Sequence, residues 1–565
     1  MLIYTNNENK RVKEMQYSAK VVDHLGLIAG MVEELGIVKT IDKAIPQDTD
    51  KRHLTIGQVV KALIINGLGF TGRPMYLTSQ FFTTKATEIL IDEGVEASHI
   101  NDNTIGRAMD TLYEYGVSPL FGQISVQAFE ALQLQPQVAH LDSTSFKVFG
   151  KDYAPSDKFV TQDEEGKDVR PSVIEVTHGY SKDHRQDLAQ VMLNMIVENR
   201  AGIPMAIEAL SGNSSDKATF AKSAETYASM IQAQTTDACI TADSAIYSKE
   251  NLQILKSSGL NWITRVPESM KESKQAIINS KINNNWKEHS SDKRYKYITQ
   301  SSEYGEVKQT WVIVYSKEAH KRTIATLNRR YEKLSIAEHK AMDSLSKERF
   351  ICIEDAQKEL ENFTKSSKLT DIEITMNSTP IYKRGRRKKN VVAEVDRLEY
   401  SFTCTAISSS LERYQKDLHS GSCFILGSNN LSKTPQEIID GYKNQYVVEK
   451  GFAFLKSKDF LADAIFLKSP ERIEALLMIM ALSLMVYTSL EYRIRHELQE
   501  QNLTFNNQKR KPTKKPTTRW VFQCFEGIQA LYVHETKKTI ILNINEQQRI
   551  IISLLGKLYE KKYGF

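Results

Sequence analysis

The stretch QVAHLDSTSF, residues 137–146, marks a change in the pattern of the chain. Before it, from about residue 21 to residue 134, apolar residues recur at helical spacing and are interrupted by turn signals such as Gly69 and Gly94. From residue 137 onward the apolar runs are short and rich in Val, Ile and Thr, as is typical of strands. The sequence therefore predicts an all-helical N-terminal domain followed by an α/β domain.

Four more apolar runs follow this stretch and predict neighbouring strands of one sheet. They are SVIEVTHGY (172–180), LAQVMLNMIV (188–197), GIPMAIEAL (202–210) and ACITADSAIY (238–247). The last has a buried-strand core of four residues, 239–242, and ends on Asp243.

The next part of the chain is polar and mixed. Strand-like pieces flank a Lys- and Glu-rich middle, 317–362, that is typical of a helix. FILGSNNL (424–431) predicts a last strand, and Pro435 then opens a long helix that Thr434 can cap, with Glu437 in its first turn. Another helix is expected at 470–500, with short mixed structure after Trp520.

These patterns predict five parts along the chain. In order they are a helical N-terminal domain (1–135), the first part of an α/β core (136–264), a β-rich mixed insertion (265–423), the second part of the core (424–500), and a C-terminal basic loop and tail (501–565).

Composition sets bounds on the class of protein. A chain of 565 residues with 41% apolar residues can form several domains and a large core. Its five cysteines stand singly, without a CxxC pair, which argues against a disulfide framework or a structural zinc site. The N-terminus does not resemble a signal peptide, and the apolar run at 475–487 is too short to cross a bilayer. We therefore expect a cytoplasmic protein with no membrane partner.

Basic residues gather in two runs, although the net charge is only +6. KRGRRKK (383–389) and KRKPTKKPTTR (509–519) each hold six Lys or Arg residues and no acid. Either run could contact DNA phosphates. The alternative is an ordinary solvated loop.

Two aspartates are placed where metal ligands are useful. Asp142 and Asp243 each follow an apolar run and have small hydroxylated neighbours. Carboxylates at strand ends are held stiffly yet stay open on one side, and Mg²⁺ prefers such oxygen ligands. The alternative for each residue is a turn or helix-cap aspartate.

The helix after Pro435 carries a polar line. Tyr442, Gln445, Glu449 and Lys456 are spaced by three, four and seven residues, which places them in one stripe of a continuous helix. Apolar residues on both sides predict a largely buried helix with this line facing a groove. A solvated face is the alternative.

At these residues the sequence resembles the DDE transposases of bacterial insertion sequences. The branch with a Tyr, Arg, Glu, Lys signature on the helix of the third acid is matched by Tyr442, Gln445, Glu449 and Lys456. Further resemblance lies in HGYSKDHRQDL (178–188), GNSSD (212–216), WITRVP (262–267) and the N-terminal stretches INGLGFTGRPMYL and NDNTIGRAMDTLY. The resemblance spans nearly the whole chain.

The resemblance implies a ribonuclease-H-like core interrupted by a β-rich insertion, and a helical N-terminal domain (1–135) that engages DNA or dimerises. It implies that Asp142, Asp243 and Glu449 are the catalytic residues and hold two Mg²⁺ (or Mn²⁺) ions, whose ligands should lie within about 8 Å of one another. Lys456 is then expected near a phosphate, and Tyr442 near the DNA backbone or as a support of the site. Gln445 departs from the usual Arg and supplies no charge, which weakens the expected hold on the DNA end.

Other residues have both a functional and an ordinary interpretation. Lys182, His184 and Arg185 could line the DNA groove, or lie in a plain turn between strands. Trp262 and Trp520 could stack on an unpaired base, although a Trp among apolar neighbours is usually a core residue.

The expected function is transposition of an insertion sequence. The partners are double-stranded DNA, both the inverted-repeat ends and the target, and a second copy of the chain in a homodimer on DNA. Two rivals remain: a catalytically silent DNA-binding derivative, and a nuclease of the same fold that does not join strands.

Overall fold

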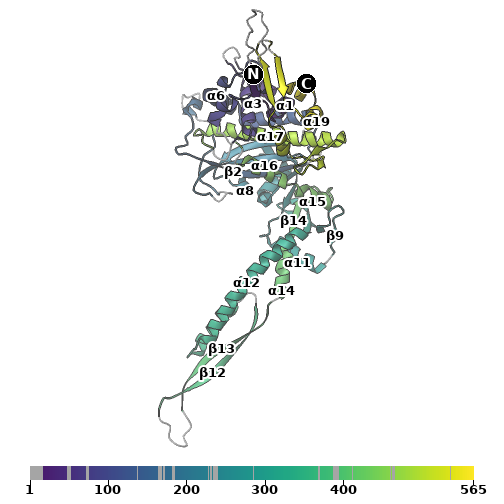
Figure 1. Cartoon of the computed structure of the whole chain (residues 1–565). Coiled ribbons are helices and arrows are strands. Elements are labelled where there is room, and N and C mark those ends of the chain that lie inside the picture. The colour runs from purple at the N-terminus through teal and green to yellow at the C-terminus, as the bar shows by residue number, and fades with distance from the viewer. Residues whose placement is uncertain are drawn as a thin grey trace, which may run out of the picture. The chain divides into compact units, whose positions relative to one another are not determined.

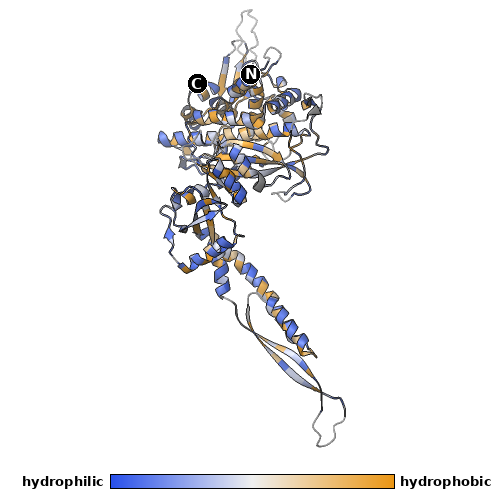
Figure 2. Cartoon of the chain, turned by 180° about the vertical axis from the view of Figure 1, so that it is seen from behind, coloured by the Kyte–Doolittle hydropathy of each residue, from blue (hydrophilic) through white to orange (hydrophobic). Residues whose placement is uncertain are grey.

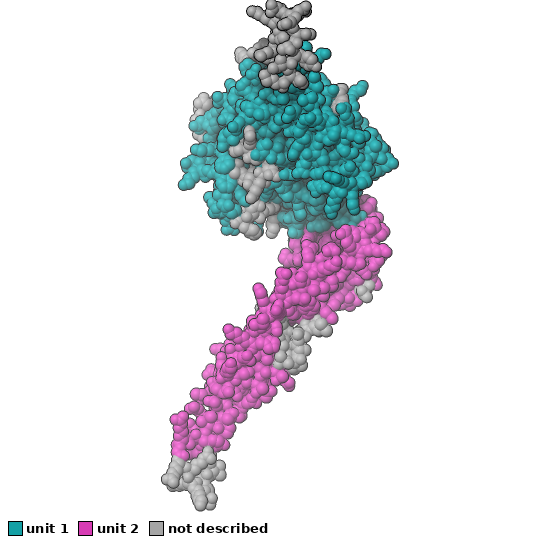
Figure 3. Space-filling view, in the orientation of Figure 1, with its two compact units in different colours: residues 1–264, 303–307, 440–565 teal, residues 265–302, 308–439 magenta. Residues whose placement is uncertain are grey.

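The computed structural model forms two compact units, shown in Figure 3. Unit 1 comprises residues 1–264, 303–307 and 440–565, and unit 2 comprises residues 265–302 and 308–439. These boundaries differ from the expected insertion at 265–423, since unit 2 continues to residue 439. The structure describes residues 17–564 apart from 48–51, 72–74, 137, 163–167, 170–171, 181–184, 227, 229–231, 233–238, 284, 367–369, 386–393, 410, 458–459, 461–464, 535 and 537.

Five strands of unit 1 form a mixed sheet in the order β6-β5-β2-β7-β8. Neighbours β6, β5 and β2 are antiparallel, whereas β2, β7 and β8 are parallel. The strands are β2 (Ala139–Val148), β5 (Ala189–Glu198), β6 (Pro204–Ser211), β7 (Cys239–Ala242) and β8 (Asn261–Arg265). Helices α8 (Asp216–Thr226) and α10 (Lys249–Ser257) make the crossovers. The predicted α/β class and four of the five predicted strands are confirmed.

The strand predicted at 172–180 is wrong. This segment makes only an isolated bridge, in which Thr177 exchanges backbone hydrogen bonds with Gln190. Because β5 already has β2 on one side and β6 on the other over most of its length, it has no free edge for another strand. Short strands β3 (Thr161–Gln162) and β4 (Asp168–Val169) pair with each other nearby in the sequence.

Helix α17 (Pro470–Glu500) is the central helix of unit 1. Its bounds are those predicted from the sequence. It packs against N-terminal helices, against β6 and against α16 (Tyr446–Leu455), as Figure 1 shows. By length and composition α17 could cross a membrane, yet 83% of its most apolar window is buried. This burial is that of a core helix.

The N-terminal region is helical, as predicted. Thr55 and Gln58 form a capping box at the start of α3, so the polar groups that open this buried helix are satisfied. Its helices are α1 (Leu25–Glu34), α2 (Ile37–Ala44), α3 (Ile56–Leu68), α4 (Thr78–Phe82), α5 (Thr87–Leu90), α6 (Asp102–Tyr115) and α7 (Val117–Ala131).

The C-terminal part is joined to the N-terminal helices. Strand β1 (Tyr17–Val21) pairs with β17 (Gln529–Val533), and β17 pairs with β18 (Lys538–Leu542). The region also has β15 (Phe505–Asn506), β16 (Pro512–Thr513), α18 (Thr518–Cys524), α19 (Glu546–Leu555) and α20 (Lys557–Lys562). Residues 501–565 are thus more ordered than the loop and tail that the sequence predicts, because their apolar side chains complete the N-terminal core.

Unit 2 has both strands and helices. Four strands follow the order β14-β11-β10-β9, and two more form a long hairpin. The strands are β9 (Lys287–Glu288), β10 (Tyr295–Tyr304), β11 (Val307–Ser316), β12 (Thr370–Tyr382), β13 (Val395–Ser409) and β14 (Cys423–Ser428), and the helices are α11 (Lys271–Asn283), α12 (Lys317–Lys347), α13 (Ile353–Ser366), α14 (Leu411–Ser422) and α15 (Pro435–Lys443), whose last four residues belong to unit 1.

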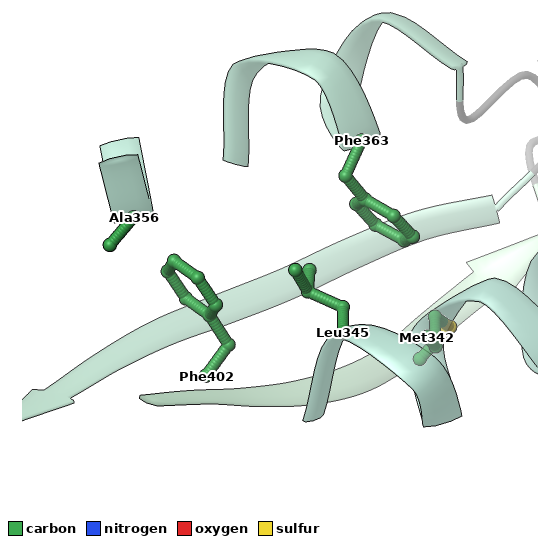
Figure 4. Close-up of a cluster of buried hydrophobic side chains, with 5 residues drawn as sticks. All are labelled: Met342, Leu345, Ala356, Phe363 and Phe402. Carbon is green, nitrogen blue, oxygen red and sulfur yellow. The ribbon is translucent and has the colours of Figure 1, made fainter. Parts of the chain in front are cut away.

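A small apolar cluster holds α12, α13 and the β12–β13 hairpin together. Figure 4 shows Met342, Leu345, Ala356, Phe363 and Phe402, all buried, at this meeting point. Hydrophilic residues occupy much of the rest of α12 in Figure 2, in agreement with its Lys- and Glu-rich sequence. The predicted helix at 317–362 is therefore confirmed, with a break between α12 and α13.

Candidate active site

Asp142 and Asp243 are carried by adjacent parallel strands. The parallel register between β2 and β7 runs from Ala139 opposite Ile240 to Leu141 opposite Ala242. Asp142 and Asp243 are the next residue on each strand, and Asp243 keeps an extended backbone. Since neighbouring strands lie about 4.8 Å apart, the register places these two carboxylates side by side.

Each aspartate is held by local hydrogen bonds. Asp142 Oδ1 accepts from the N–H of Ser143 at 2.8 Å, and Asp243 Oδ1 accepts from the N–H of Ala245 at 2.8 Å. The second bond caps a short 3-10 helix, Ser244–Ile246. The hydroxyl of Thr264 donates to the carbonyl of Asp243 at 2.7 Å, which ties this turn to β8. Asp243 is therefore the cap residue of the turn that follows β7.

The prediction that Asp142 ends its strand is wrong. Strand β2 continues to Val148, because its antiparallel pairing with β5 extends over all ten residues. The pairing with β7 stops at Leu141, so Asp142 lies where the parallel neighbour ends. Both aspartates are half-buried.

The single long helix predicted after Pro435 is broken. Helix α15 ends at Lys443 and α16 begins at Tyr446. Between them are two turn-type hydrogen bonds that span three residues, from Gln445 N–H to Tyr442 O and from Val447 N–H to Asn444 O. The predicted cap at Thr434 and Glu437 is present. Because of the break, helical spacing does not connect Tyr442 to Glu449, and the continuous polar stripe is wrong.

Helix α16 lies over the face of the sheet that carries Asp142. Met195 is opposite Asp142 in the antiparallel register, so both side chains point to one face. A Cβ added to Gly451 of α16 would be 3.7 Å from Met195 Cε, and the ammonium of Lys456 lies 5.8 Å from the ring centre of Phe146, which shares that face. Glycine at position 451 allows the close approach of helix and sheet.

The end of α15 also meets this face. A Cβ added to Gly441 would be 2.9 Å from Cδ1 of Ile263 in β8. Ile263 is paired with Thr241 of β7, and Thr241 is paired with His140 of β2. Asp142 is two residues after His140, so its side chain points to the same face of the sheet as these three side chains. The two helices thus extend across the sheet beside both aspartates.

Glu449 lies on α16 with an exposed side chain. Within the described parts of the chain, no three His, Cys, Asp or Glu side chains are gathered closely enough to hold a metal ion. The fold therefore pairs Asp142 with Asp243 and places the helix of Glu449 over the same face, without a closed cluster of three carboxylates. Oxygen ligands on two adjacent strands are the kind that a divalent cation binds.

The three other residues of the predicted polar line are half-buried: Tyr442, Gln445 and Lys456. Gln445 is the N-cap residue of α16 but makes no side-chain cap bond. The ammonium of Lys456 contacts the ring of Phe146 in β2, four residues beyond Asp142.

Lys182 and His184 lie outside the described residues. Arg185 is exposed and forms two hydrogen bonds with Asp187, at 2.8 and 2.7 Å. Hydrogen bonding to Arg185 lowers the pKa of Asp187 to about 2. Asp187 is therefore the acid that orients Arg185.

His140 was not singled out from the sequence. It is buried two residues before Asp142, and its Nε2 lies 2.8 Å from Asn199 Oδ1. Burial lowers the pKa of His140 to about 4, so the imidazole is neutral near pH 7. A lone His in an apolar strand carries no sequence signal that separates this supporting role from an ordinary core position.

The tryptophans and basic runs have ordinary surroundings where they are described. Trp262 is buried in the core, and the indole N–H of Trp520 donates to Asn506 O at 2.7 Å. Residues 386–389 of the first basic run lie outside the described part, and Lys383 pairs with Glu394 at 3.1 Å. In the second run the guanidinium of Arg519 lies 4.7 Å from the ring centre of Phe70.

Two family models match the chain. The model described as "Transposase DDE domain" matches residues 133–486, and the one described as "Domain of unknown function (DUF4277)" matches residues 17–126. The first match covers more than half of the sequence and contains all three predicted acids. The chain therefore belongs to the DDE transposase family.

Two comparisons add no further assignment. No curated protein matches the chain. Among solved structures, the chain is similar to a piggyBac transposase synaptic complex with hairpin DNA, at 9% sequence identity and a TM-score of 0.34, with 90% of this chain and 82% of that chain covered. A TM-score this low carries no argument about fold or ligand.

Proposed function

We propose that the five-stranded sheet of unit 1 is the ribonuclease-H-like core of a transposase that cuts and joins DNA. The observation that carries the proposal is the register that brings Asp142 of β2 and Asp243 after β7 side by side. Membership of the DDE transposase family gives this pair a chemical role. The two antiparallel and two parallel pairings between the five strands support the core assignment.

Asp142, Asp243 and Glu449 are the proposed catalytic residues and ligands of two Mg²⁺ or Mn²⁺ ions. The paired aspartates fit such ions by their donor chemistry, and Glu449 lies on the helix that covers their face of the sheet. Bound ions would lower the pKa of an attacking water and stabilise charge on the departing oxygen. Closing the site requires the Glu449 side chain to turn toward the aspartates when DNA and metal bind.

The proposed reaction has two phosphodiester steps at the ends of an insertion sequence. In the first, water attacks the phosphorus at the element end, one P–O bond forms, and the bond to the 3′ oxygen breaks. In the second, the freed 3′ hydroxyl attacks a phosphorus of target DNA, and a target P–O bond breaks as the new one forms. In-line positioning by the protein accelerates both steps.

The proposed partners are double-stranded DNA and a second copy of the chain, in the cytoplasm of a bacterium. Lys456 lies near Phe146, on the face of the sheet that carries Asp142, and Gln445 and Tyr442 lie at the junction of α15 and α16. Lys182, His184 and Arg185 are proposed for the DNA groove. Arg185 would have to exchange its bond to Asp187 for a phosphate.

The test separates cutting from binding. Asp142→Asn, Asp243→Asn and Glu449→Gln are assayed on duplex DNA from the flanks of the gene, with Mg²⁺ for cleavage and without metal for binding. We expect loss of cleavage with affinity nearly unchanged, because the acids hold metal and the basic residues hold phosphate. Glu225→Gln, at an exposed helical glutamate of α8, is the matched control. Near-normal cleavage by any of the three variants would falsify that residue's role.

Two rival functions predict other outcomes. A silent DNA-binding derivative binds the duplex but yields no cleavage product with either Mg²⁺ or Mn²⁺. A nuclease without joining activity cuts the element end but yields no strand-transfer product with target plasmid. The family match favours transposition over both rivals.

A further inference from the structure

The helical region of unit 1 contains a pocket of about 240 Å³. It lies between the segment that leads into α3 and the first half of α6, within the stretch that matches the domain of unknown function. Its polar lining consists of Arg52, His53, His99, Thr104 and Arg107. None of the proposed catalytic residues lines it.

The pocket is cationic. Two guanidinium groups, two imidazoles and one hydroxyl line it, and no carboxylate does. Within the described part of the chain neither Arg52 nor Arg107 pairs with an acidic side chain, and Arg107 Nε donates to the carbonyl of Asn103 at 3.2 Å. The terminal nitrogens of both guanidiniums therefore remain as donors for a ligand, and both residues are exposed at the mouth.

The two histidines form one wall. The rings of His53 and His99 are parallel within 5° and their centres are 4.4 Å apart. The backbone N–H of Glu96 donates to Nδ1 of His99 at 3.2 Å, so a neutral His99 carries its proton on Nε2 and donates from there.

The floor of the pocket is apolar. Leu54, Ile56 and Val59 are buried beneath the charged rim. Charges at the edge of such a low-dielectric floor interact more strongly than charges in open water. Paired guanidinium groups over an apolar floor suit a tetrahedral oxyanion, because each guanidinium can donate two hydrogen bonds to neighbouring oxygens.

We propose that this pocket binds a backbone phosphate of the DNA, at a distance along the chain from the catalytic acids. The choice of DNA as the source of the phosphate rests on the proposed function. A phosphate contact fixes the register of a protein on a duplex without reading sequence. The pocket therefore positions the helical domain on DNA, whatever the sequence of the element end.

The test measures binding of a labelled duplex to the full chain by fluorescence anisotropy over a range of NaCl concentrations. Arg52→Gln, Arg107→Gln and the double variant are compared with wild type and with Lys39→Gln, an exposed cation of α2 outside the pocket. We expect about tenfold weaker binding per arginine, from loss of a charge-assisted hydrogen bond. The slope of log affinity against log salt should flatten by about one unit per arginine. Lys39→Gln should match wild type.

The opposite results overturn the proposal. Unchanged affinity and slope in the double variant contradict it, as does a wild-type chain that binds no duplex. Thermal unfolding with sodium phosphate, against sodium chloride at equal ionic strength, tests a free-anion site. Phosphate stabilisation lost in the double variant, together with full duplex affinity, would identify a pocket for free anions and not for DNA. These experiments measure binding and not cleavage. They therefore test the pocket even if Asp142, Asp243 or Glu449 proves not to be catalytic.

Discussion

Asp142 and Asp243 directly follow the last parallel pair between β2 and β7, Leu141 opposite Ala242. The two residues are 101 positions apart in the sequence (243 − 142), so local structure alone cannot join them. Their neighbourhood depends on the crossover that returns the chain parallel to β2. Each aspartate accepts a local backbone hydrogen bond, and the strand register places both in the proposed site.

The cap and the catalytic role of Asp243 can be separated by two substitutions. Asp243→Asn keeps an oxygen that accepts from the N–H of Ala245, so we expect nearly unchanged stability and no cleavage. Asp243→Ala removes the acceptor as well and should lower the free energy of unfolding by about 1 kcal/mol. Denaturant unfolding and a cleavage assay on both variants measure this. Equal stability of the two variants would contradict the cap role.

The half-buried Glu474 predicts a pH-dependent stability. Burial raises the pKa of Glu474 to about 7, and the nearby Glu471 adds to this, while the N–H of Ile174 opposes it. The folded state therefore holds a proton that the unfolded chain releases near pH 4.5. This contribution is fully present below that pH and is lost as pH rises toward 7, by up to about 3 kcal/mol.

Glu474→Gln isolates that contribution. The wild-type minus variant difference in unfolding free energy should fall between about pH 4.5 and 7. Taking the difference removes the effect of His24 and His140, whose pKa values burial lowers to about 4 and which act in the opposite direction. A difference that does not change with pH would contradict the protonation of Glu474 in the folded state.

The end of the chain should stabilise the N-terminal helices. The hydroxyl of Tyr559 donates to Glu34 at 2.6 Å, and the ring of Tyr559 lies where a Cβ on Gly30 would be, 2.6 Å from two ring carbons. We expect Tyr559→Phe to cost about 1 kcal/mol, as loss of one hydrogen bond. Gly30→Ala should cost about 1–3 kcal/mol by overpacking. Thermal unfolding measures both, and a Gly30→Ala variant as stable as wild type would show that α1 and α20 are not in close contact.

The basic run at 383–389 predicts a salt effect on DNA binding. Replacing residues 386–389 by Gln should flatten the slope of log affinity against log salt by about one unit per lost phosphate contact. Lys383→Gln alone should do less, because Lys383 already pairs with Glu394. Duplex binding at several salt concentrations measures both variants. An unchanged slope in the fourfold variant would favour the alternative that this run is an ordinary solvated loop.

Local patterns in the sequence determined much of this protein. The helix at 470–500, the strand that ends before Asp243, and the helical N-terminal region were predicted with nearly their observed bounds. Each depends on short-range periodicity and on caps such as Ser469, which accepts from the N–H of Arg472. The signature residues also pointed to the family that the comparison then showed.

Tertiary structure alone decided the rest. Residues 172–180 have a strand-like sequence but find no free strand edge. The helix after Pro435 breaks before Tyr446, and its two parts pack on different strands, Gly441 against Ile263 and Gly451 against Met195. The pairing of β1 with β17 and the pocket at Arg52 and Arg107 join segments far apart in the chain. Periodicity reports only the neighbours within a few residues, whereas these contacts depend on which buried surfaces meet when the whole chain folds.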